Sequence, residues 1–221
     1  MKILIVAPHM DDEVLGVGGT IAKHIDNGDE VCVVIVANRI YNHSLDLELL
    51  KKDRTNTSNA KKILGYNHVI FLGLDDERLD NSVQDIIIPL EEEYNKFLPD
   101  IVYTNHFGDN NQDHRAVFEA VRVITRQSQK APPSKVFLYE TPSSTEQSPP
   151  LLSNAFVPNY FVNIDNFLDQ KILAMQCYEN EMRDYPNPRS IKGIKSYAQF
   201  RGIQSGFHYA EAFMIMRDVW T

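Results

Sequence analysis

Cysteine is scarce in this chain: Cys32 and Cys177 are the two among 221 residues. They stand far apart, and neither belongs to a CxxC motif or to a cluster of cysteine and histidine. A disulfide framework and a thiolate metal site are therefore not expected. The cytoplasm, which is reducing, is the simplest location for such a protein.

The chain also has fewer basic than acidic residues and no long apolar run. The 22 lysine and arginine residues are outnumbered by 30 acidic residues, which gives a net charge of −8. Nucleic acids and anionic membranes bind clustered basic residues, so neither is an expected partner. No apolar run is long enough to span a bilayer, and residues 1–8 lack the basic region and cleavage site of a signal peptide, so stable membrane insertion is not expected.

Hydrophobic residues make up 43% of the chain, which is enough for one substantial core. This length and composition predict one domain over residues 1–221. Nothing in the pattern describes the outer surface, so a homo-oligomer stays open.

Short β-rich apolar runs alternate with longer segments of helical spacing. The expected strands are residues 2–7, 30–37, 68–72, 101–104, 135–139 and 160–164, and the expected helices are residues 14–27, 45–64, 81–97, 114–128, 165–181 and 190–203. This alternation predicts a three-layer α/β fold, with a mostly parallel sheet flanked by helices. In such folds ligands bind at the carboxyl ends of the strands. Specificity would then reside in the loops around 38–46, 105–112 and 140–155.

An imidazole and three carboxylates follow the first expected strand directly, as Pro8-His9-Met10-Asp11-Asp12-Glu13. Adjacent acids repel one another, so a cation bound among them is the economical explanation. His9 and Asp12 are three residues apart, which lets one turn present both to a divalent metal such as zinc. Acids also favour helix N-termini, but capping does not explain the preceding histidine and proline.

A second polar cluster, residues 105–115, follows the strand expected at 101–104. His114 is a candidate for the third protein ligand, which would leave a fourth position for water, as in catalytic zinc sites. Asp113 is a candidate for an acid that orients a metal-binding imidazole or tunes its proton affinity. An Asp-His pair alone is more often a helix cap, but its pairing with the first cluster favours a metal site.

These two clusters resemble the PIG-L/LmbE-like deacetylase family, whose signature is Pro-His-Pro-Asp-Asp-Glu after the first strand, with a later Asp-His that completes a zinc site. The likeness extends over nearly the whole chain. Weaker matches are Arg54, Phe71-Leu72-Gly73, Asp76, residues 139–144, Pro188-Arg189-Ser190 and residues 209–213.

The resemblance implies a Rossmann-like hydrolase that removes an N-acetyl group from an N-acetylglucosamine-type sugar or sugar conjugate. Carried over position by position, it makes His9, Asp12 and His114 the ligands of Zn²⁺ and Asp11 the general base. The partner that it implies is a small molecule or glycoconjugate with an N-acetylated sugar.

Two positions depart from the family pattern. Met10 replaces a proline, which is expected to alter only the turn. Asn111 stands where many members have a histidine that is assigned to oxyanion stabilisation or proton delivery. That role would pass to His106 or His208, or Asn111 itself would serve as a neutral hydrogen-bond donor.

Three further residues are candidates for substrate contacts or catalysis. His208 would donate to the oxyanion or protonate the leaving nitrogen. The planar guanidinium of Arg54 suits a sugar hydroxyl or a phosphate. Tyr139, at a strand end, would line the rim of the substrate site.

Other functions compete with this interpretation. A different metal-dependent amidase or a phosphoesterase would also use carboxylates and histidines, although a two-metal site needs more ligands than the two clusters offer. A catalytically inactive carbohydrate-binding protein would have little need of Asp11. A nucleotide-binding module is disfavoured because acids precede the glycines at 16–19, where a phosphate would sit.

Overall fold

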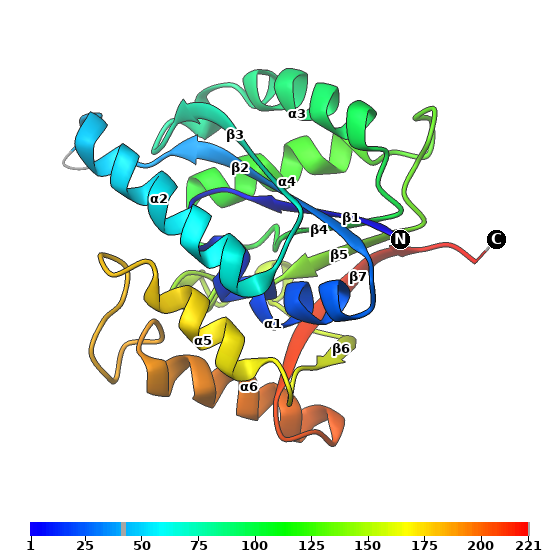
Figure 1. Ribbon diagram of the computed structural model, residues 1–221. Coiled ribbons are helices and arrows are strands. Elements are labelled where there is room, and N and C mark those ends of the chain that lie inside the picture. The colour runs from blue at the N-terminus through cyan, green and yellow to red at the C-terminus, as the bar shows by residue number, and fades with distance from the viewer. Residues whose placement is uncertain (41–42, 221) are drawn as a thin grey trace.

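The protein folds around a seven-stranded sheet with the strand order β3-β2-β1-β4-β5-β7-β6 (Figure 1). The structure, a computed structural model, describes residues 1–40 and 43–220. Residues 41 and 42, in one of the loops expected to set specificity, lie outside the described residues. The strands are β1 Lys2–Ala7, β2 Glu30–Asn38, β3 His68–Asp75, β4 Ile101–Asn105, β5 Lys135–Tyr139, β6 Tyr160–Asn163 and β7 Ala210–Asp218.

Helices cover both faces of the sheet, as Figure 1 shows. Residues of α1, α2, α5 and α6 pack in one hydrophobic cluster and residues of α3 and α4 in a second. Within β1, Ile3 and Ile5 belong to the first cluster, and Leu4 and Val6 to the second, because successive strand residues point to opposite faces. The helices are α1 Asp12–Asp26, α2 Leu47–Leu64, α3 Val83–Phe97, α4 Gln112–Ile124, α5 Leu168–Gln176 and α6 Ile191–Ser205.

This arrangement confirms the predicted three-layer α/β fold with a mostly parallel sheet. It differs from the prediction by one additional strand and by one shorter helix. Strand β7, which was not expected, pairs antiparallel with both β5 and β6. Helix α5 is shorter than the expected 165–181, and an irregular segment connects it to α6. The prolines Pro186 and Pro188 in that segment oppose a helix, because they lack a backbone N–H.

The carboxyl ends of β1 and β4 bring the two polar clusters of the sequence together. The strands are neighbours in the sheet, with Ile3 opposite Ile101. After β1 the chain turns through His9 and enters α1, and after β4 it loops to Asn111, which caps α4 by accepting a hydrogen bond from the Asp113 N–H. Both helices therefore begin at the same edge of the sheet.

A buried ion pair ties β7 to α1 and α5. Lys171 Nζ lies 2.6 Å from Glu211 Oε1, and the same carboxylate accepts hydrogen bonds from the N–H groups of Gly19 and Thr20. Both charged side chains are almost fully buried. The strand that was not predicted is thus held to the helix layer by charge as well as by packing.

We expect Lys171→Met to lower the free energy of unfolding by about 3–5 kcal/mol, because it leaves the Glu211 carboxylate buried without its cation. Urea denaturation measures this change, and Lys195→Met on the exposed side of α6 is the control. A loss below about 1 kcal/mol would show that water or another donor reaches Glu211.

No helix within residues 1–40 and 43–220 combines the length and the apolar character needed to cross a lipid bilayer.

Candidate metal centre

His9, Asp12 and His114 form one compact, buried group of potential metal ligands. Asp12 Oδ2 lies 3.2 Å from His9 Nδ1 and 3.2 Å from His114 Nε2. All of the candidate ligand atoms lie within 4.8 Å of one another, and each residue is at most 5% exposed. The turn after β1 supplies His9, the first residue of α1 is Asp12, and the first turn of α4 supplies His114.

The spacing of these atoms fits one tetrahedral ion. Zinc binds nitrogen and oxygen ligands at about 2.0–2.2 Å, so two ligands of a tetrahedral site lie about 3.3 Å apart. The observed 3.2 Å separations match this value. Two imidazoles and one carboxylate are also a donor set that suits zinc or a similar divalent metal. The group is therefore fit to hold one metal ion.

Carboxylates hold the far side of each imidazole. His9 Nε2 lies 2.9 Å from Asp76 Oδ1 and 3.2 Å from Asp113 Oδ2, while Asp109 Oδ1 lies 3.3 Å from His114 Nδ1. Contacts of this kind fix the orientation of a metal-binding histidine and raise its basicity. Asp113 also accepts hydrogen bonds from two backbone N–H groups in the segment after β3, so it joins that segment to the centre.

Asp11 lies fully buried beside the centre with a strained backbone. Its φ of 112° is in the left-handed region, which non-glycine residues seldom occupy. The Glu13 carboxylate accepts the Asp11 N–H at 3.0 Å and the Tyr178 hydroxyl at 2.6 Å, which holds the turn in place. Asp11 Oδ2 accepts a hydrogen bond from Arg189 at 3.0 Å, whereas Oδ1 has no hydrogen-bond partner.

Two arginines and a glutamate surround Asp11 on its outer side. Arg39 Nη2 lies 3.6 Å from Asp11 Oδ1, and both Arg39 and Arg189 form ion pairs with Glu181. The two cations thus face two carboxylates. Arg189 also donates from Nε to Ser143 Oγ at 2.6 Å, which connects the group to the loop after β5.

Burial and charge shift the pKa values of this cluster. Burial raises the pKa of Asp11 to about 6, although Arg189 and Arg39 oppose the rise. Burial also raises the pKa of Glu13 to about 7. For His114, burial lowers the pKa, but the negative charges of Asp12 and Asp109 outweigh it and bring the pKa to about 9. The centre therefore attracts positive charge, whether a proton or a metal ion.

A family model described as GlcNAc-PI de-N-acetylase, PIG-L, matches residues 4–125, the part of the chain that contains all three potential metal ligands. The chain belongs to the PIG-L family. An Escherichia coli K12 relative, the uncharacterized deacetylase YaiS, is 30% identical over 80% of this chain and 90% of its own length. The matching family and this relative are thus both named for deacetylation, which supports an amide hydrolase.

Solved structures share the fold of this PIG-L chain. An N,N'-diacetylchitobiose deacetylase from Pyrococcus horikoshii, complexed with its inhibitor, has a TM-score of 0.76 and 24% identity, and the match covers 97% of this chain and 83% of that one. The 4-carboxy-2-hydroxymuconate hydratase GalB of Pseudomonas putida KT2440 has a TM-score of 0.78 and 22% identity, covering 100% and 98%. Since a hydratase has the same fold, the fold alone does not decide the reaction.

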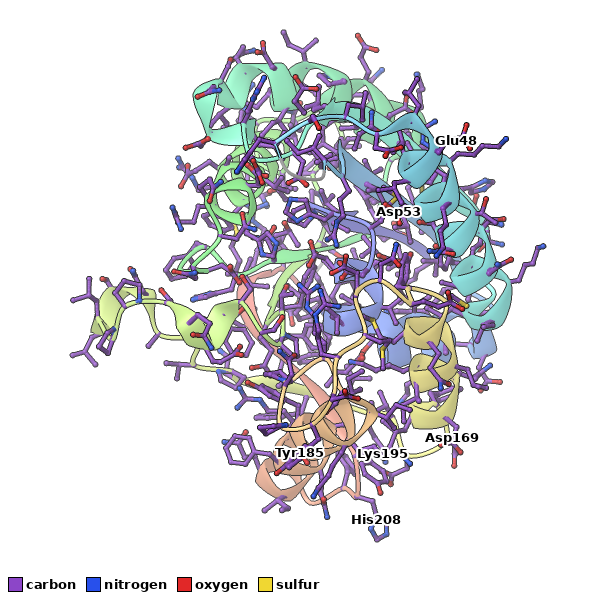
Figure 2. All side chains as sticks on the ribbon, turned by 90° about the vertical axis from the view of Figure 1, so that its left-hand side faces the viewer. Glu48, Asp53, Asp169, Tyr185, Lys195 and His208 are labelled. Carbon is purple, nitrogen blue, oxygen red and sulfur yellow. The ribbon has the colours of Figure 1, made fainter. Side chains whose placement is uncertain are left out.

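The predicted residues Arg54 and His208 have other surroundings than the metal ligands. Arg54 is exposed on α2, where it stacks on the Phe71 ring at 5.0 Å and donates to Asn38 Oδ1 at 3.1 Å. His208 is exposed after α6, and Figure 2 shows its side chain directed away from the body of the molecule. His208 is therefore not one of the residues that surround the metal centre.

His106 and Tyr139 are buried among internal contacts, whereas Asn111 is half-buried and stays a candidate hydrogen-bond donor. His106 is buried and its Nε2 lies 2.9 Å from the Asn154 carbonyl oxygen, while burial lowers its pKa. The Asn111 side chain caps α4. Tyr139 is fully buried and donates its hydroxyl to the Val6 carbonyl at 2.9 Å. Its expected place at the substrate rim is therefore wrong.

Tyr139→Phe is expected to leave KM for substrate unchanged and to lower the free energy of unfolding by about 1 kcal/mol, because it removes one buried hydrogen bond. Steady-state kinetics and urea denaturation separate the two effects. A tenfold rise in KM without loss of stability would restore Tyr139 as a substrate contact.

Five charged residues beside the metal centre were assigned no function from the sequence, although Asp76 and Arg189 lie in motifs that match the family; the five are Arg39, Asp76, Asp109, Glu181 and Arg189. A usable signal was present for Arg39, because it directly follows β2 and strand ends border the site. Glu181 and Arg189 lie in the irregular segment between α5 and α6, which the sequence pattern does not place near any strand end.

Proposed function

We propose that this PIG-L chain is a zinc-dependent hydrolase that removes the N-acetyl group from an N-acetylglucosamine-type sugar or sugar conjugate. The observation that carries the proposal is the buried triad of His9, Asp12 and His114, with the Asp11 carboxylate directly beside it. The proposal has further support from the names of two similar proteins, the uncharacterized deacetylase YaiS and an N,N'-diacetylchitobiose deacetylase of the same fold.

His9, Asp12 and His114 would hold the ion, and Asp76, Asp113 and Asp109 would keep the two imidazoles in position. Zinc in such a site acts as a Lewis acid that polarises water and a carbonyl oxygen. Burial of the triad keeps bulk water from competing with the ligands.

Asp11 is the proposed general base. A base works best when its pKa lies near the working pH, and the pKa of Asp11 is raised to about 6. Its carboxylate would accept a proton from the water that attacks the amide carbonyl, and would then return that proton to the leaving nitrogen. The hydrogen bond from Arg189 keeps one carboxylate oxygen occupied, so the proton would go to Oδ1, which has no hydrogen-bond partner.

The substrate proposal has support from a relative. The Pyrococcus horikoshii protein that shares this fold is a diacetylchitobiose deacetylase, and its substrate is an N-acetylated sugar. We further propose that the chain acts as one domain in the cytoplasm, which agrees with two free cysteines.

The test is acetate release by metal-stripped protein reloaded with zinc, with magnesium or with no metal. The substrates are N-acetylglucosamine, its nucleotide sugar, N,N'-diacetylchitobiose and a glycolipid head group. We expect zinc-dependent release of acetate and a free amine in equal amounts from at least one of them. Zinc bound at one per chain without release from any would exclude the acetyl-sugar proposal and leave a different amide, a phosphoester or a hydration reaction.

A further inference from the structure

Asp11 stands at the N-cap position of α1, but its carboxylate does not cap the helix. It accepts no hydrogen bond from the described N–H groups of the first turn, and the φ of Asp11 is 112°. Asp46 stands at the same position of α2 and behaves in the usual way, with a φ of −105° and hydrogen bonds from the N–H groups of Glu48 and Leu49. The two helices thus begin with the same residue type in two conformations.

A glutamate two residues further along the chain distinguishes these two helix starts. Glu48 in α2 is exposed, whereas Glu13 in α1 is fully buried and its Oε2 accepts the Asp11 N–H at 3.0 Å. A glutamate that reaches back to the N-cap N–H is half of a capping box, here from one residue closer than usual. Because Asp11 is itself fully buried, its N–H needs this acceptor.

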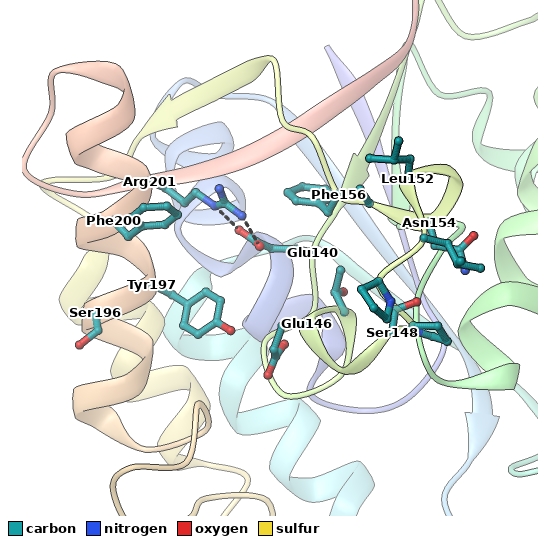
Figure 3. A pocket seen from close by; sticks show the side chains of 15 residues that line it. Glu140, Glu146, Ser148, Leu152, Asn154, Phe156, Ser196, Tyr197, Phe200 and Arg201 are labelled. Atoms are coloured by element: carbon teal, nitrogen blue, oxygen red, sulfur yellow. Dashed lines mark hydrogen bonds and ion pairs between the residues drawn. The ribbon is translucent and has the colours of Figure 1, made fainter.

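Tyr178 fixes the orientation of the Glu13 carboxylate. The tyrosine follows α5, is buried and donates its hydroxyl to Glu13 Oε1 at 2.6 Å. Tyr178 thus holds one carboxylate oxygen, and the Asp11 backbone holds the other. None of these three residues lines the cavity of about 750 Å³ between α6 and the loop that follows β5 (Figure 3). A substitution at Glu13 can therefore move Asp11 without altering that cavity.

We propose that Glu13 is a positioning residue for Asp11, the proposed base. By holding the Asp11 N–H, Glu13 keeps this backbone in the left-handed region and the Asp11 carboxylate away from the N-terminus of α1. Without Glu13, Asp11 would relax to the conformation of Asp46 and accept an N–H of α1. A carboxylate that is hydrogen-bonded in this way is a weaker base. The effect on turnover rests on the proposed function, but the backbone conformation of Asp11 does not.

Acetate release from N,N'-diacetylchitobiose by zinc-loaded Glu13→Ala and Glu13→Gln tests the effect on turnover. We expect Glu13→Ala to lose at least about tenfold in kcat, with KM and zinc content unchanged, because the step affected is proton transfer. Glu13→Gln should stay within about threefold of the wild-type kcat, because its amide oxygen can still accept the Asp11 N–H. Glu48→Ala, at the equivalent position of α2, is the control and should have the wild-type kcat.

Crystal structures of the same two variants test the geometry without any need for turnover. In Glu13→Ala we expect a negative φ at Asp11 and a hydrogen bond from an α1 N–H to its carboxylate, whereas Glu13→Gln should keep the wild-type geometry. If Glu13→Ala does not fold, Tyr178→Phe replaces it, because this change removes only the hydroxyl that fixes Glu13. Tyr178→Phe should lower kcat by at least about threefold, the worth of one hydrogen bond.

A positive φ at Asp11 in the Glu13→Ala structure, or a wild-type kcat in that variant, would overturn the proposal. An equal loss of kcat in Glu13→Ala and Glu13→Gln would also overturn it, because the amide keeps the acceptor. Absence of acetate release by the wild type, together with the expected change of φ in Glu13→Ala, would count against the proposed reaction and not against the role of Glu13 in holding Asp11.

Discussion

Asp12→Ala should lose its bound zinc and reduce acetate release to background. Asp12 is the one negatively charged member of the triad, and its Oδ2 lies between both imidazoles at 3.2 Å. Without it, two neutral imidazoles remain, which is too small a donor set to keep zinc in a catalytic site. Metal analysis after dialysis measures the stoichiometry, and the acetate assay measures the activity.

The matched control for this substitution is Asp26→Ala, an exposed acid at the other end of α1. It should keep one zinc per chain and full activity. Circular dichroism would show whether both variants are folded. Retention of one zinc per chain by folded Asp12→Ala would contradict the triad and shift the site towards the other side of His9, where Asp76 and Asp113 lie.

Asp11→Asn is expected to keep its zinc and to lose about 10²–10⁴-fold in kcat. The amide has the size of the carboxylate and can still contact Arg189, but it cannot accept a proton from water. The loss should fall on kcat more than on KM, because the step affected is proton transfer. Zinc content and steady-state kinetics, measured on one preparation, test both statements.

Comparison of the two variants separates metal binding from proton transfer. Asp12→Ala should lose both metal and turnover, whereas Asp11→Asn should lose turnover alone. Near-normal kcat in Asp11→Asn would exclude Asp11 as the base. Asp26→Asn, which makes the same change at the far end of α1, is the control.

The fold was largely predictable because the parallel strands β1, β2, β4 and β5 are buried on both faces and so appear as continuous apolar runs. Strand β7 lacks this signal. Its sequence from Ala210 to Met216 is rich in alanine, glutamate and methionine, residues with high helix propensity, and its strand geometry comes from pairing with β5 and β6. In β7, pairing with neighbouring strands thus outweighs the helix propensity of the local sequence.

The candidate site was predictable where a residue follows a strand end in a dense polar motif, as His9, Asp12 and His114 do. Glu181 and Arg189 could not be placed in this way, because they lie in an irregular segment far along the chain, from which Arg189 contacts Asp11 and Glu181 contacts Arg189. Their position depends on how α5 and α6 pack, which no local pattern contains.

Tyr139 was predicted at the substrate rim but lies in the core. It ends a strand, as site residues do, yet its ring points into the core, where Gly16 leaves room for it. A Cβ at Gly16 would lie 2.2 Å from the Tyr139 ring, so the glycine and the tyrosine fit only together. The position of a residue in a strand predicts whether its backbone lies at the carboxyl edge of the sheet. The direction of its side chain depends on the residues that pack against it from other elements.

The place of β7 inside the sheet has a consequence for biosynthesis. Among the described strands, β6 pairs with β7 alone, although β6 precedes it by about fifty residues in the chain. During translation β1 to β5 can assemble in order of emergence, but β6 must wait until residues 210–218 have left the ribosome. Until β7 emerges, the nascent chain therefore carries an unpaired strand that is exposed to chaperones and to aggregation.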